Sequence, residues 1–392
     1  MATLPPNFTL LQVVPELETG GVEQTTLDVA RAVVKAGGRA LVASRGGRLE
    51  PALKAAGAEL VQMPVHSKNP FVMAANTARL TRLIRKEKVD VVHVRSRAPA
   101  FSAISAARRT GTPVVATYHG VYKAKGALKR WYNAVMTRGD LVIANSEFTR
   151  DHVIAEHGVA ADRIVAIPRG VDIERFDPVH VGSERVARLR EAWGVAADDA
   201  RLKVLLAGRL TRWKGQLLLI EAAARLKAEG RSDVLLLLAG DDQGRHEYRA
   251  ELDAAIAGAG LEDQVRIVGH CEDMPAAYLV ADLAAAPSLD PEAFGRTAVE
   301  PQAMGRAVLA ADHGAARETV VPGLTGWLVT PRDAGAWAGA LAEALDAGPA
   351  RRAEMGEQGR ARARALYSVD AMCDATLAVY RRLVAGRARA VA

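Results

Sequence analysis

The sequence contains little cysteine and no long apolar run, and these two absences narrow the classes of protein that fit it. Among 392 residues only Cys271 and Cys373 are cysteines. Two cysteines are too few for a disulfide framework, and they cannot form a metal site alone. The longest apolar runs, such as residues 234–239, have the length of a strand and are far too short to span a bilayer. The sequence therefore predicts a soluble globular protein without structural disulfides.

Several motifs that would assign a cofactor or a destination are also absent. No Gly-x-Gly-x-x-Gly segment occurs, which counts against a dinucleotide oxidoreductase, and no Walker-type phosphate loop occurs. No Asp-x-Asp pair follows a predicted strand to bridge a metal ion. The first residues show no charged region followed by an apolar one, so no signal peptide is expected. We expect a cytoplasmic protein that needs neither a metal nor an organic cofactor.

The residues that are present describe an ordinary globular chain with uneven charge. Hydrophobic residues make up 49% and charged residues 25%, and the length suits two domains. Residues 1–175 hold 25 Lys and Arg against 15 Asp and Glu, whereas residues 176–392 hold 27 against 30. The basic first half favours an anionic partner such as a membrane surface, a lipid-linked phosphate or nucleic acid. The composition of a GC-rich genome explains the same excess, so both interpretations stay open.

Short apolar runs alternate with longer helical stretches throughout the chain. Continuous apolar strands between helices indicate parallel sheets that are covered on both faces. The pattern occurs twice, which predicts an α/β protein of two doubly wound, Rossmann-like domains with a junction in residues 172–200. The predicted strands are residues 8–14, 39–43, 59–63, 89–94, 113–117, 141–144 and 163–167 in the first half, and residues 202–207, 234–239, 265–268, 283–286, 307–310 and 326–329 in the second.

The most informative segment is PSLDPEAFGRTAVEPQAMG, residues 287–305. Glu292 falls in a loop, residues 294–295 stand where a helix opens, and Glu300 lies more than a turn inside that helix. The free N–H groups at a helix start favour an anion such as a phosphate. A carboxylate on each side of a phosphate can take the hydroxyls of the sugars at both ends of a nucleoside diphosphate. The segment therefore indicates a clamp for a nucleotide sugar.

Polar residues after other predicted strands fit the same ligand, because doubly wound sheets bind ligands at the carboxyl ends of their strands. Arg209 and Lys214 follow residues 202–207 and can place two cations on one diphosphate, where a solvated basic turn is the plain alternative. Gly20 and Gly21 follow the first strand and allow close backbone approach. His119 ends another strand, where it either contacts the transferred sugar or the acceptor hydroxyl, or bonds a nearby backbone carbonyl.

Residues 123–136 mix four cations with Trp131, Tyr132 and aliphatic side chains. Basic residues beside aromatic ones at helical spacing suit an anionic lipid interface. A core-facing helix with a charged outer face explains the spacing equally well. Two further polar sites have structural interpretations: His93 ends a strand, and Ser146 follows Asn145 as a good N-cap.

These segments together resemble the signature of retaining glycosyltransferases of family 4, which have the GT-B fold. The spacing of Glu292 and Glu300, the Phe-Gly after the first of them and the closing Ala-Met-Gly carry the resemblance. AGRLTRWKG at residues 207–215 is similar to the family's diphosphate clamp, Gly20–Gly21 to its first glycine loop, and PRGVD at residues 168–172 to its interdomain segment. The matches run in the family's order over nearly the whole chain.

The resemblance implies two Rossmann-like domains that face each other across a cleft. Residues 1–175 would take the acceptor, a glycan or a lipid-linked molecule, and the final helix, residues 369–392, would pack back on this domain. Residues 176–368 would bind a UDP- or GDP-linked sugar. The implied reaction moves a hexose to a hydroxyl with retention, typically in the synthesis of bacterial polysaccharide or lipopolysaccharide, at the inner face of the plasma membrane or free in the cytoplasm.

The resemblance also assigns roles to single residues. Glu300 would bond the ribose hydroxyls and Glu292 the sugar hydroxyls. Arg209 and Lys214 would hold the diphosphate, with Gly20 and Gly21 closing on it from the other domain and His119 near the sugar. Backbone amides would surround the sugar and phosphate, namely those of Phe294, Gly295, Arg296 and Thr297.

The chain departs from the family's pattern at three positions. Arg296 stands where an aliphatic residue is usual and would add a cation for an acidic sugar or acceptor. Pro301 stands where alanine is usual, and proline inside a helix is expected to shift the helix start or kink it. Arg169 replaces a more usual asparagine.

Two other classes of function share the fold. A sugar-nucleotide epimerase would need acid and base residues around the sugar C2, and none is identified. A non-catalytic protein that binds a nucleotide sugar or an anionic lipid would not need the four charged residues Arg209, Lys214, Glu292 and Glu300 together. A nucleic-acid binder would explain the basic half, but no basic helix or aromatic sheet motif supports it.

Overall fold

The structure is a computed structural model of the 392-residue chain, and it describes residues 3–18, 20–122 and 126–391, with side chains up to residue 387. Two compact units make up the chain: residues 1–170 with 369–392, and residues 171–368. The first unit ends at Gly170 instead of residue 175, because Val171 is tied to the second unit. Its N–H donates to the Tyr367 carbonyl at 2.7 Å, and it bridges to Ser368.

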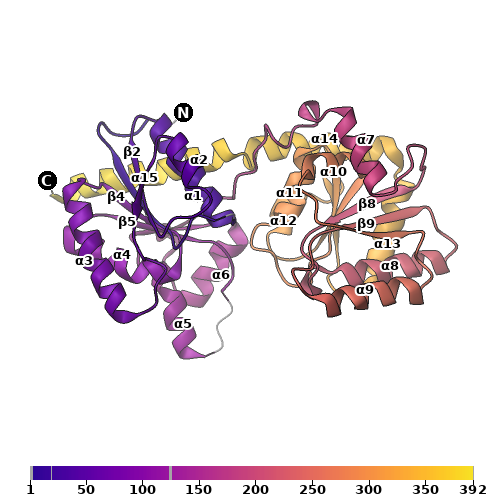
Figure 1. The fold of residues 1–392 in the computed structure, drawn as a ribbon, viewed down its shortest axis with the longest axis horizontal. Coiled ribbons are helices and arrows are strands. Elements are labelled where there is room, and N and C mark those ends of the chain that lie inside the picture. The colour runs from indigo at the N-terminus through magenta and orange to yellow at the C-terminus, as the bar shows by residue number, and fades with distance from the viewer. Residues whose placement is uncertain (1–2, 19, 123–125, 392) are drawn as a thin grey trace. The chain divides into compact units, whose positions relative to one another are not determined.

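The first unit is a seven-stranded parallel sheet between two layers of helices (Figure 1). The strands lie in the order β3-β2-β1-β4-β5-β6-β7, so the sequence order reverses between β1 and β4. The strands are β1 (Thr9–Val13), β2 (Arg39–Ser44), β3 (Glu59–Gln62), β4 (Val91–Val94), β5 (Val114–Tyr118), β6 (Leu141–Ala144) and β7 (Ile164–Ala166). The helices are α1 (Gly21–Lys35), α2 (Glu50–Ala55), α3 (Pro70–Lys86), α4 (Arg97–Thr110), α5 (Ala127–Asn133), α6 (Glu147–His157), α15 (Val369–Val391) and the short η1 (Ala134–Thr137) and η2 (Ala161–Arg163).

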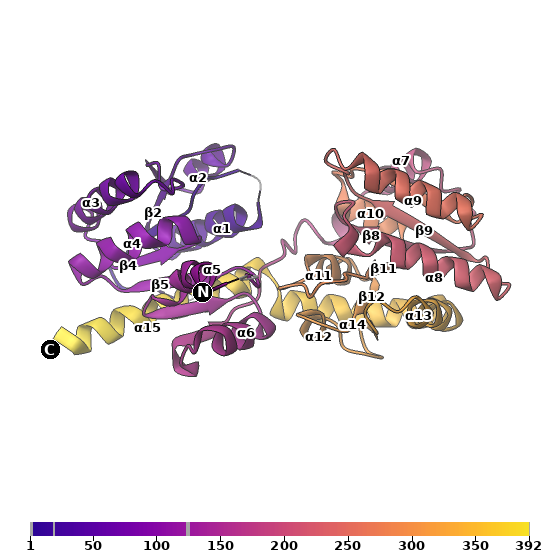
Figure 2. The same ribbon diagram turned by 90° about the horizontal axis from the view of Figure 1, so that it is seen from below.

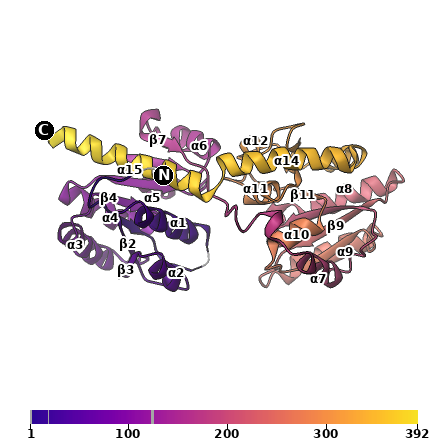
Figure 3. The same cartoon turned by 90° about the horizontal axis from the view of Figure 1, so that it is seen from above.

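Successive residues of each strand face opposite layers, which explains the continuous apolar runs. Leu11 packs with α3, α4 and α6, whereas Leu10 packs with α1, α2 and α15. Figure 3 shows α15 running alongside α1. His93 on β4 is structural: its ring nitrogens bond the hydroxyls of Tyr380 at 2.5 Å and Thr117 at 2.7 Å.

The second unit is a six-stranded parallel sheet in the order β10-β9-β8-β11-β12-β13, with its reversal between β8 and β11. Figure 2 shows α8 beside α13 on one of its faces. The strands are β8 (Leu202–Ala207), β9 (Val234–Ala239), β10 (Val265–Gly269), β11 (Leu283–Ala286), β12 (Ala307–Ala311) and β13 (Gly326–Val329). The helices are η3 (Pro178–His180), α7 (Ser183–Ala192), η4 (Arg212–Lys214), α8 (Gln216–Ala228), α9 (His246–Gly258), α10 (Met274–Val280), α11 (Arg296–Ala303), α12 (Ala316–Thr319), α13 (Ala334–Asp346) and α14 (Gly348–Leu366).

All thirteen predicted strands are present, with ends that agree or differ by at most two residues, and the predicted α/β class is confirmed. In open parallel sheets, ligands bind at the carboxyl ends of the strands where the strand order reverses. These points are the ends of β1 and β4 in the first unit and of β8 and β11 in the second. Within the described residues no helix is long and apolar enough to cross a membrane.

Candidate functional site

The second unit brings Lys214 and Glu292 together at the ends of the neighbouring strands β8 and β11. Lys214 closes η4 after β8, and Glu292 lies in the loop between β11 and α11. The Lys214 Nζ is 2.5 Å from the Glu292 Oε1, which also accepts a hydrogen bond from the Ser288 Oγ at 2.7 Å. Both side chains are largely shielded from solvent, at 12% and 21% exposure. The ion pair therefore holds the ammonium group in one place.

The geometry of this pair suits the recognition of a second anion. An ammonium group has three N–H donors, and the Glu292 bond uses one of them. The Lys214 Nζ also lies 4.4 Å from the centre of the Trp213 ring. Separate roles were predicted for Lys214 and Glu292, on the diphosphate and on the sugar, and the structure shows the two groups in direct contact. A ligand that met both would place its negative charge and its hydroxyl groups side by side.

Glu300 is already engaged by side chains of its own unit. Its Oε1 accepts from the Arg296 Nε at 2.8 Å and Nη2 at 2.7 Å, and its Oε2 accepts from the Tyr278 hydroxyl at 3.3 Å. The residue is 8% exposed. Burial raises the pKa of Glu300 above its usual value, while Arg296 and Tyr278 lower it. The carboxylate that the resemblance assigns to ribose hydroxyls is thus oriented by a cation that the family's pattern does not contain.

Helix α11 begins one residue after residues 294–295, where the sequence predicted that a helix opens. Gly295 adopts a left-handed conformation (φ 78°) immediately before the helix, and the helix begins at Arg296. Pro301 lies inside the helix and does not shift its start, contrary to one of the two expected effects. Helix geometry leaves the first N–H groups, at residues 296 and 297, without acceptors one turn back, whereas the Ala298 N–H donates to the Gly295 carbonyl at 2.9 Å. The side chain of Phe294 is buried and packs edge-on against Tyr367, so Phe294 contributes to the core of the unit.

Arg209 stands apart from both pairs. It follows β8 with an exposed side chain, and among the described residues it forms no ion pair. Its carbonyl accepts a hydrogen bond from the Gln216 amide at 3.0 Å. The guanidinium group therefore remains available to a ligand, but the structure does not join it to Lys214 or Glu292.

A second group of predicted residues lies in the first unit, at the ends of β1 and β5. Gly20 precedes α1, and Gly21 is its first residue. A Cβ atom at Gly21 would lie 2.7 Å from the Arg169 Nη1, so the glycine lets this guanidinium approach the helix start. The Arg169 Nη2 is 3.4 Å from both the Nδ1 and the carbonyl oxygen of His119. Gly21, His119 and Arg169 thus form one cluster.

The contact with Arg169 determines the protonation of His119. An arginine only donates hydrogen bonds, so the His119 Nδ1 is the acceptor and the proton resides on Nε2. Burial, reinforced by the charge of Arg169, holds the pKa of His119 well below its usual value. The Nε2 atom is buried and has no hydrogen-bond partner within the described part of the chain. His119 is therefore a neutral N–H donor with an unused hydrogen bond. The alternative of a ring bonded to a neighbouring backbone carbonyl is not found there.

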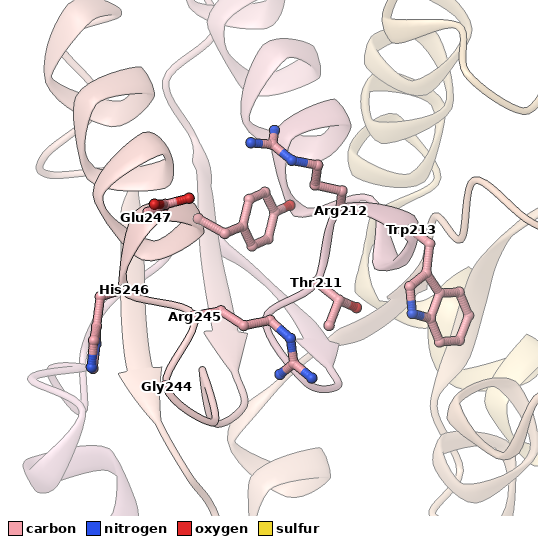
Figure 4. Close-up of a pocket in the computed structure, with 8 residues that line it drawn as sticks. Thr211, Arg212, Trp213, Gly244, Arg245, His246 and Glu247 are labelled. Atoms are coloured by element: carbon pink, nitrogen blue, oxygen red, sulfur yellow. The ribbon is translucent and has the colours of Figure 1, made fainter.

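The sequence interpretation missed the role of Arg169. It appeared only as a departure from asparagine in PRGVD, and nothing along the chain connects it to His119, 50 residues away. A cavity of about 750 Å³ was also missed (Figure 4). It lies between η4 and the loop that joins β9 to α9, where Arg212 pairs with Glu251 and lies 5.2 Å from the centre of the Tyr248 ring. Polar residues after β9 were the available signal.

Comparison with known proteins decides the family. Residues 19–175 match the model described as Glycosyltransferase Family 4, and residues 189–362 match Glycosyl transferases group 1. The chain is 33% identical over 307 residues to the D-inositol 3-phosphate glycosyltransferase of Xylanimonas cellulosilytica. The matched region covers 74% of this chain and 71% of that protein. The chain belongs to the family 4 glycosyltransferases.

Solved structures show the same fold for this glycosyltransferase. A glycosyltransferase from Rickettsia africae is 34% identical with a TM-score of 0.88, over 96% of this chain and 99% of that one. The Anabaena protein HepE, crystallised with UDP, is 24% identical with a TM-score of 0.79, over 98% of this chain and 100% of that one. The predicted family and the predicted GT-B class of two Rossmann-like units are confirmed.

One predicted surface of the glycosyltransferase is described only in part. Residues 123–125, with two of the four cations, lie outside the described residues. In the remainder, α5 carries Leu128 at 80% exposure and Trp131 at 53%. Trp131 packs on Phe101, with ring centres 5.5 Å apart. Because these apolar side chains face solvent, α5 is not simply a core-facing helix with a charged outer face.

Proposed function

We propose that this glycosyltransferase moves a hexose from a nucleoside-diphosphate sugar to a hydroxyl group with retention of the anomeric configuration. The observation that carries the proposal is the Lys214–Glu292 pair at the point where β8 and β11 end. A lysine that keeps free donors, fixed beside a carboxylate, suits a ligand that carries phosphate and sugar hydroxyls next to each other. The free N–H groups of α11 begin at Arg296, shortly after Glu292 in the chain. They favour the same anion.

In this proposal the second unit binds the donor. Lys214 and Arg209 hold the diphosphate, and Glu292 accepts hydrogen bonds from the transferred sugar. The amides at the start of α11, from Phe294 to Thr297, surround the phosphate. Glu300 takes the ribose hydroxyls while Arg296 and Tyr278 hold its carboxylate in place. The buried position of Glu300 supports this role. An oriented and poorly solvated acceptor discriminates strongly against a ligand that lacks the matching hydroxyl group.

The proposed transfer proceeds on one face of the sugar. The bond between the anomeric carbon and the diphosphate oxygen breaks while the acceptor oxygen forms its new bond to that carbon. The acceptor's proton passes to the departing phosphate oxygen, so no covalent intermediate with the protein is needed. Arg209 and Lys214 stabilise the charge that grows on the diphosphate. In the first unit, Gly20 and Gly21 offer backbone N–H groups, and His119 offers its Nε2–H to an oxygen of the sugar or acceptor.

The comparisons support a nucleotide sugar and leave two acceptor classes to test. HepE was crystallised with UDP, UDP with glucose, and UDP-glucose. The Xylanimonas relative is named for D-inositol 3-phosphate. We therefore include UDP-glucose among the donors, next to GDP-linked sugars, and D-inositol 3-phosphate among the acceptors, next to a lipid-linked glycan. The exposed Leu128 and Trp131 support a lipid-linked acceptor at an anionic membrane surface, with a role in cell-surface polysaccharide synthesis.

The first test is a thermal-shift panel of UDP, GDP, ADP and common nucleotide sugars. We expect one nucleoside diphosphate to raise the melting temperature of the wild type by a few degrees at about 100 times its Kd. Glu300→Ala and Lys214→Met should lose this shift, and Arg79→Gln with Arg82→Gln, on the exposed face of α3, should keep it. The absence of a shift with every nucleotide would overturn the proposal.

Incubation with the donor identified by that panel then separates the related functions. A transferase forms a new glycoside only when an acceptor is present, and NMR of its anomeric proton reports retention. A sugar-nucleotide epimerase would change the sugar of the donor with no acceptor. A binding protein would leave donor and acceptor unchanged. Either of the last two results would replace transfer as the function while keeping the donor site.

A further inference from the structure

A second charged cavity lies in the first unit, at the edge of the sheet opposite the candidate site. It has a volume of about 630 Å³, and its floor is formed by residues 111–114 and 139–141, which lead into β5 and β6. These are the amino ends of the strands. Gly20 and His119 follow the carboxyl ends of β1 and β5, so the strands of one sheet separate the two places. The cavity is therefore distinct from the site proposed for transfer.

Arginine dominates the lining of this cavity. The side chains come from the last turn of α4, the loop before β6, the short helix η2 and the end of α15. Asp140 is the carboxylate among the lining residues, and its Oδ2 accepts the Val114 N–H at 2.7 Å. The arginines, which we call the arginine pocket, are Arg108, Arg138, Arg163, Arg382 and Arg387.

The protein itself does not neutralise these guanidinium groups. Arg108 donates to the Arg138 carbonyl at 3.3 Å, Arg163 to the Gly139 carbonyl at 2.6 Å, and Arg382 to the Asp162 carbonyl at 2.9 Å. Throughout the described part of the chain, none of the five arginines of the pocket forms an ion pair with a carboxylate. A guanidinium has five N–H donors, so most donors of the pocket remain unused. Like charges gathered around a hollow favour an anion inside it.

The arginine pocket continues into an exposed aromatic surface. Arg108 and Arg138 also line a neighbouring cavity of about 380 Å³, together with Arg109 and Phe101. The Arg138 guanidinium lies 5.4 Å from the centre of the Trp131 ring, and that ring is half exposed. Cations beside a partly exposed tryptophan are typical of surfaces that meet phosphate headgroups.

We propose that the arginine pocket binds a phosphate-bearing anion at a site separate from sugar transfer. The planar fork of a guanidinium matches two phosphate oxygens at once, and arginines from α4, η2, α15 and the loop before β6 can surround a single phosphate or diphosphate. The phosphate belongs either to a membrane lipid or to a soluble molecule, and the chemistry of recognition is the same for both. The site does not depend on the proposed transferase activity.

The test compares two double variants of the full chain. Arg108→Gln with Arg387→Gln removes two charges from the pocket, at positions with one and no internal hydrogen bond, respectively. Arg79→Gln with Arg82→Gln removes two charges from the exposed face of α3 in the same unit. Co-sedimentation uses phosphatidylcholine vesicles with and without about one part in five of phosphatidic acid. Thermal shift uses sodium pyrophosphate against sodium chloride at equal ionic strength.

A lipid phosphate predicts that vesicle binding requires phosphatidic acid and falls about 25-fold in the pocket variant, at about fivefold per arginine. A soluble phosphate predicts that pyrophosphate stabilises the wild type and the α3 variant more than the pocket variant. Either result supports the site. The vesicle result identifies a lipid phosphate as the ligand, and the pyrophosphate result identifies a soluble one. Equal behaviour of the two variants in both assays, whether binding is kept or lost, would overturn it. Should the double variant fail to fold, Arg387→Gln alone repeats the comparison with Arg82→Gln.

Discussion

Removal of Lys214 gives the sharpest test of the ion pair in the second unit. At a separation of 2.5 Å and an effective dielectric constant of about 20, two unit charges attract by about 7 kcal/mol before desolvation is counted. Lys214→Met leaves the Glu292 carboxylate largely shielded from water, with the Ser288 hydroxyl as its other donor at 2.7 Å. Loss of one partner of a fully buried pair costs about 3–5 kcal/mol. The remaining exposure and the Ser288 bond reduce our expectation to about 2 kcal/mol.

A double-mutant cycle measures this coupling. Lys214→Met, Glu292→Gln and their combination are compared by urea unfolding, followed by tryptophan fluorescence, since most of the five tryptophans lie in the second unit. We expect a coupling of about 2 kcal/mol. The control cycle uses Arg212→Met and Glu251→Gln on a neighbouring pair that is 66% and 36% exposed, for which we expect below about 0.5 kcal/mol. Effects of Lys214→Met and Glu292→Gln that add to within about 0.4 kcal/mol would show that the two side chains are not coupled.

Three further predictions concern the charges around Glu300 and His119. Burial raises the pKa of Glu300 above the usual 4.5, so the ionised form is disfavoured in the fold. The free energy of unfolding of the wild type should fall relative to Glu300→Gln as the pH rises from about 4.5 through the raised pKa, and urea titrations check this. Arg296→Leu removes the cation that lowers the pKa of Glu300, so carbon NMR of the carboxyl group should show a still higher pKa; an unchanged value would mean that the 2.7 Å contact has no energetic weight. Arg169→Asn removes a charge that lowers the pKa of His119, so nitrogen NMR of labelled histidine should show a higher pKa and a mixture of tautomers, whereas the wild type shows Nε2–H alone. Persistence of the single tautomer in Arg169→Asn would contradict the positioning role.

The strands could be predicted from the sequence because burial on both faces leaves an unbroken apolar run. Residues 202–207 and 234–239 appear in the structure with the predicted bounds, as β8 and β9. The sequence also placed Glu292 in a loop and the opening of the next helix at residues 294–295, one residue before α11 begins at Arg296. Such signals depend only on residues that are near one another along the chain, so a single sequence is enough to identify them.

Contacts between residues that are far apart along the chain could not be predicted from the sequence. Lys214 and Glu292 are 78 residues apart, and each alone fits a separate role on the ligand. Lys214 contacts Glu292 because β8 and β11 are neighbours in the sheet. The order of the strands along the chain does not show which strands are neighbours. The Arg296–Glu300 pair is different, because its spacing of four residues on one helix is a local signal that the sequence contains. The arginine pocket joins Arg108 on α4 to Arg387 on α15, which lie far apart along the chain.

A calorimetric titration of the wild-type glycosyltransferase with UDP and with GDP tests the proposed donor site most directly. We expect one of them to bind to a single site, and Lys214→Met to weaken this binding about 10- to 100-fold through loss of a charge-assisted hydrogen bond. The pocket variant Arg108→Gln with Arg387→Gln should bind it as the wild type does. Failure of both nucleotides to bind, or equal binding by wild type and Lys214→Met, would contradict the assignment of the donor site to the ends of β8 and β11.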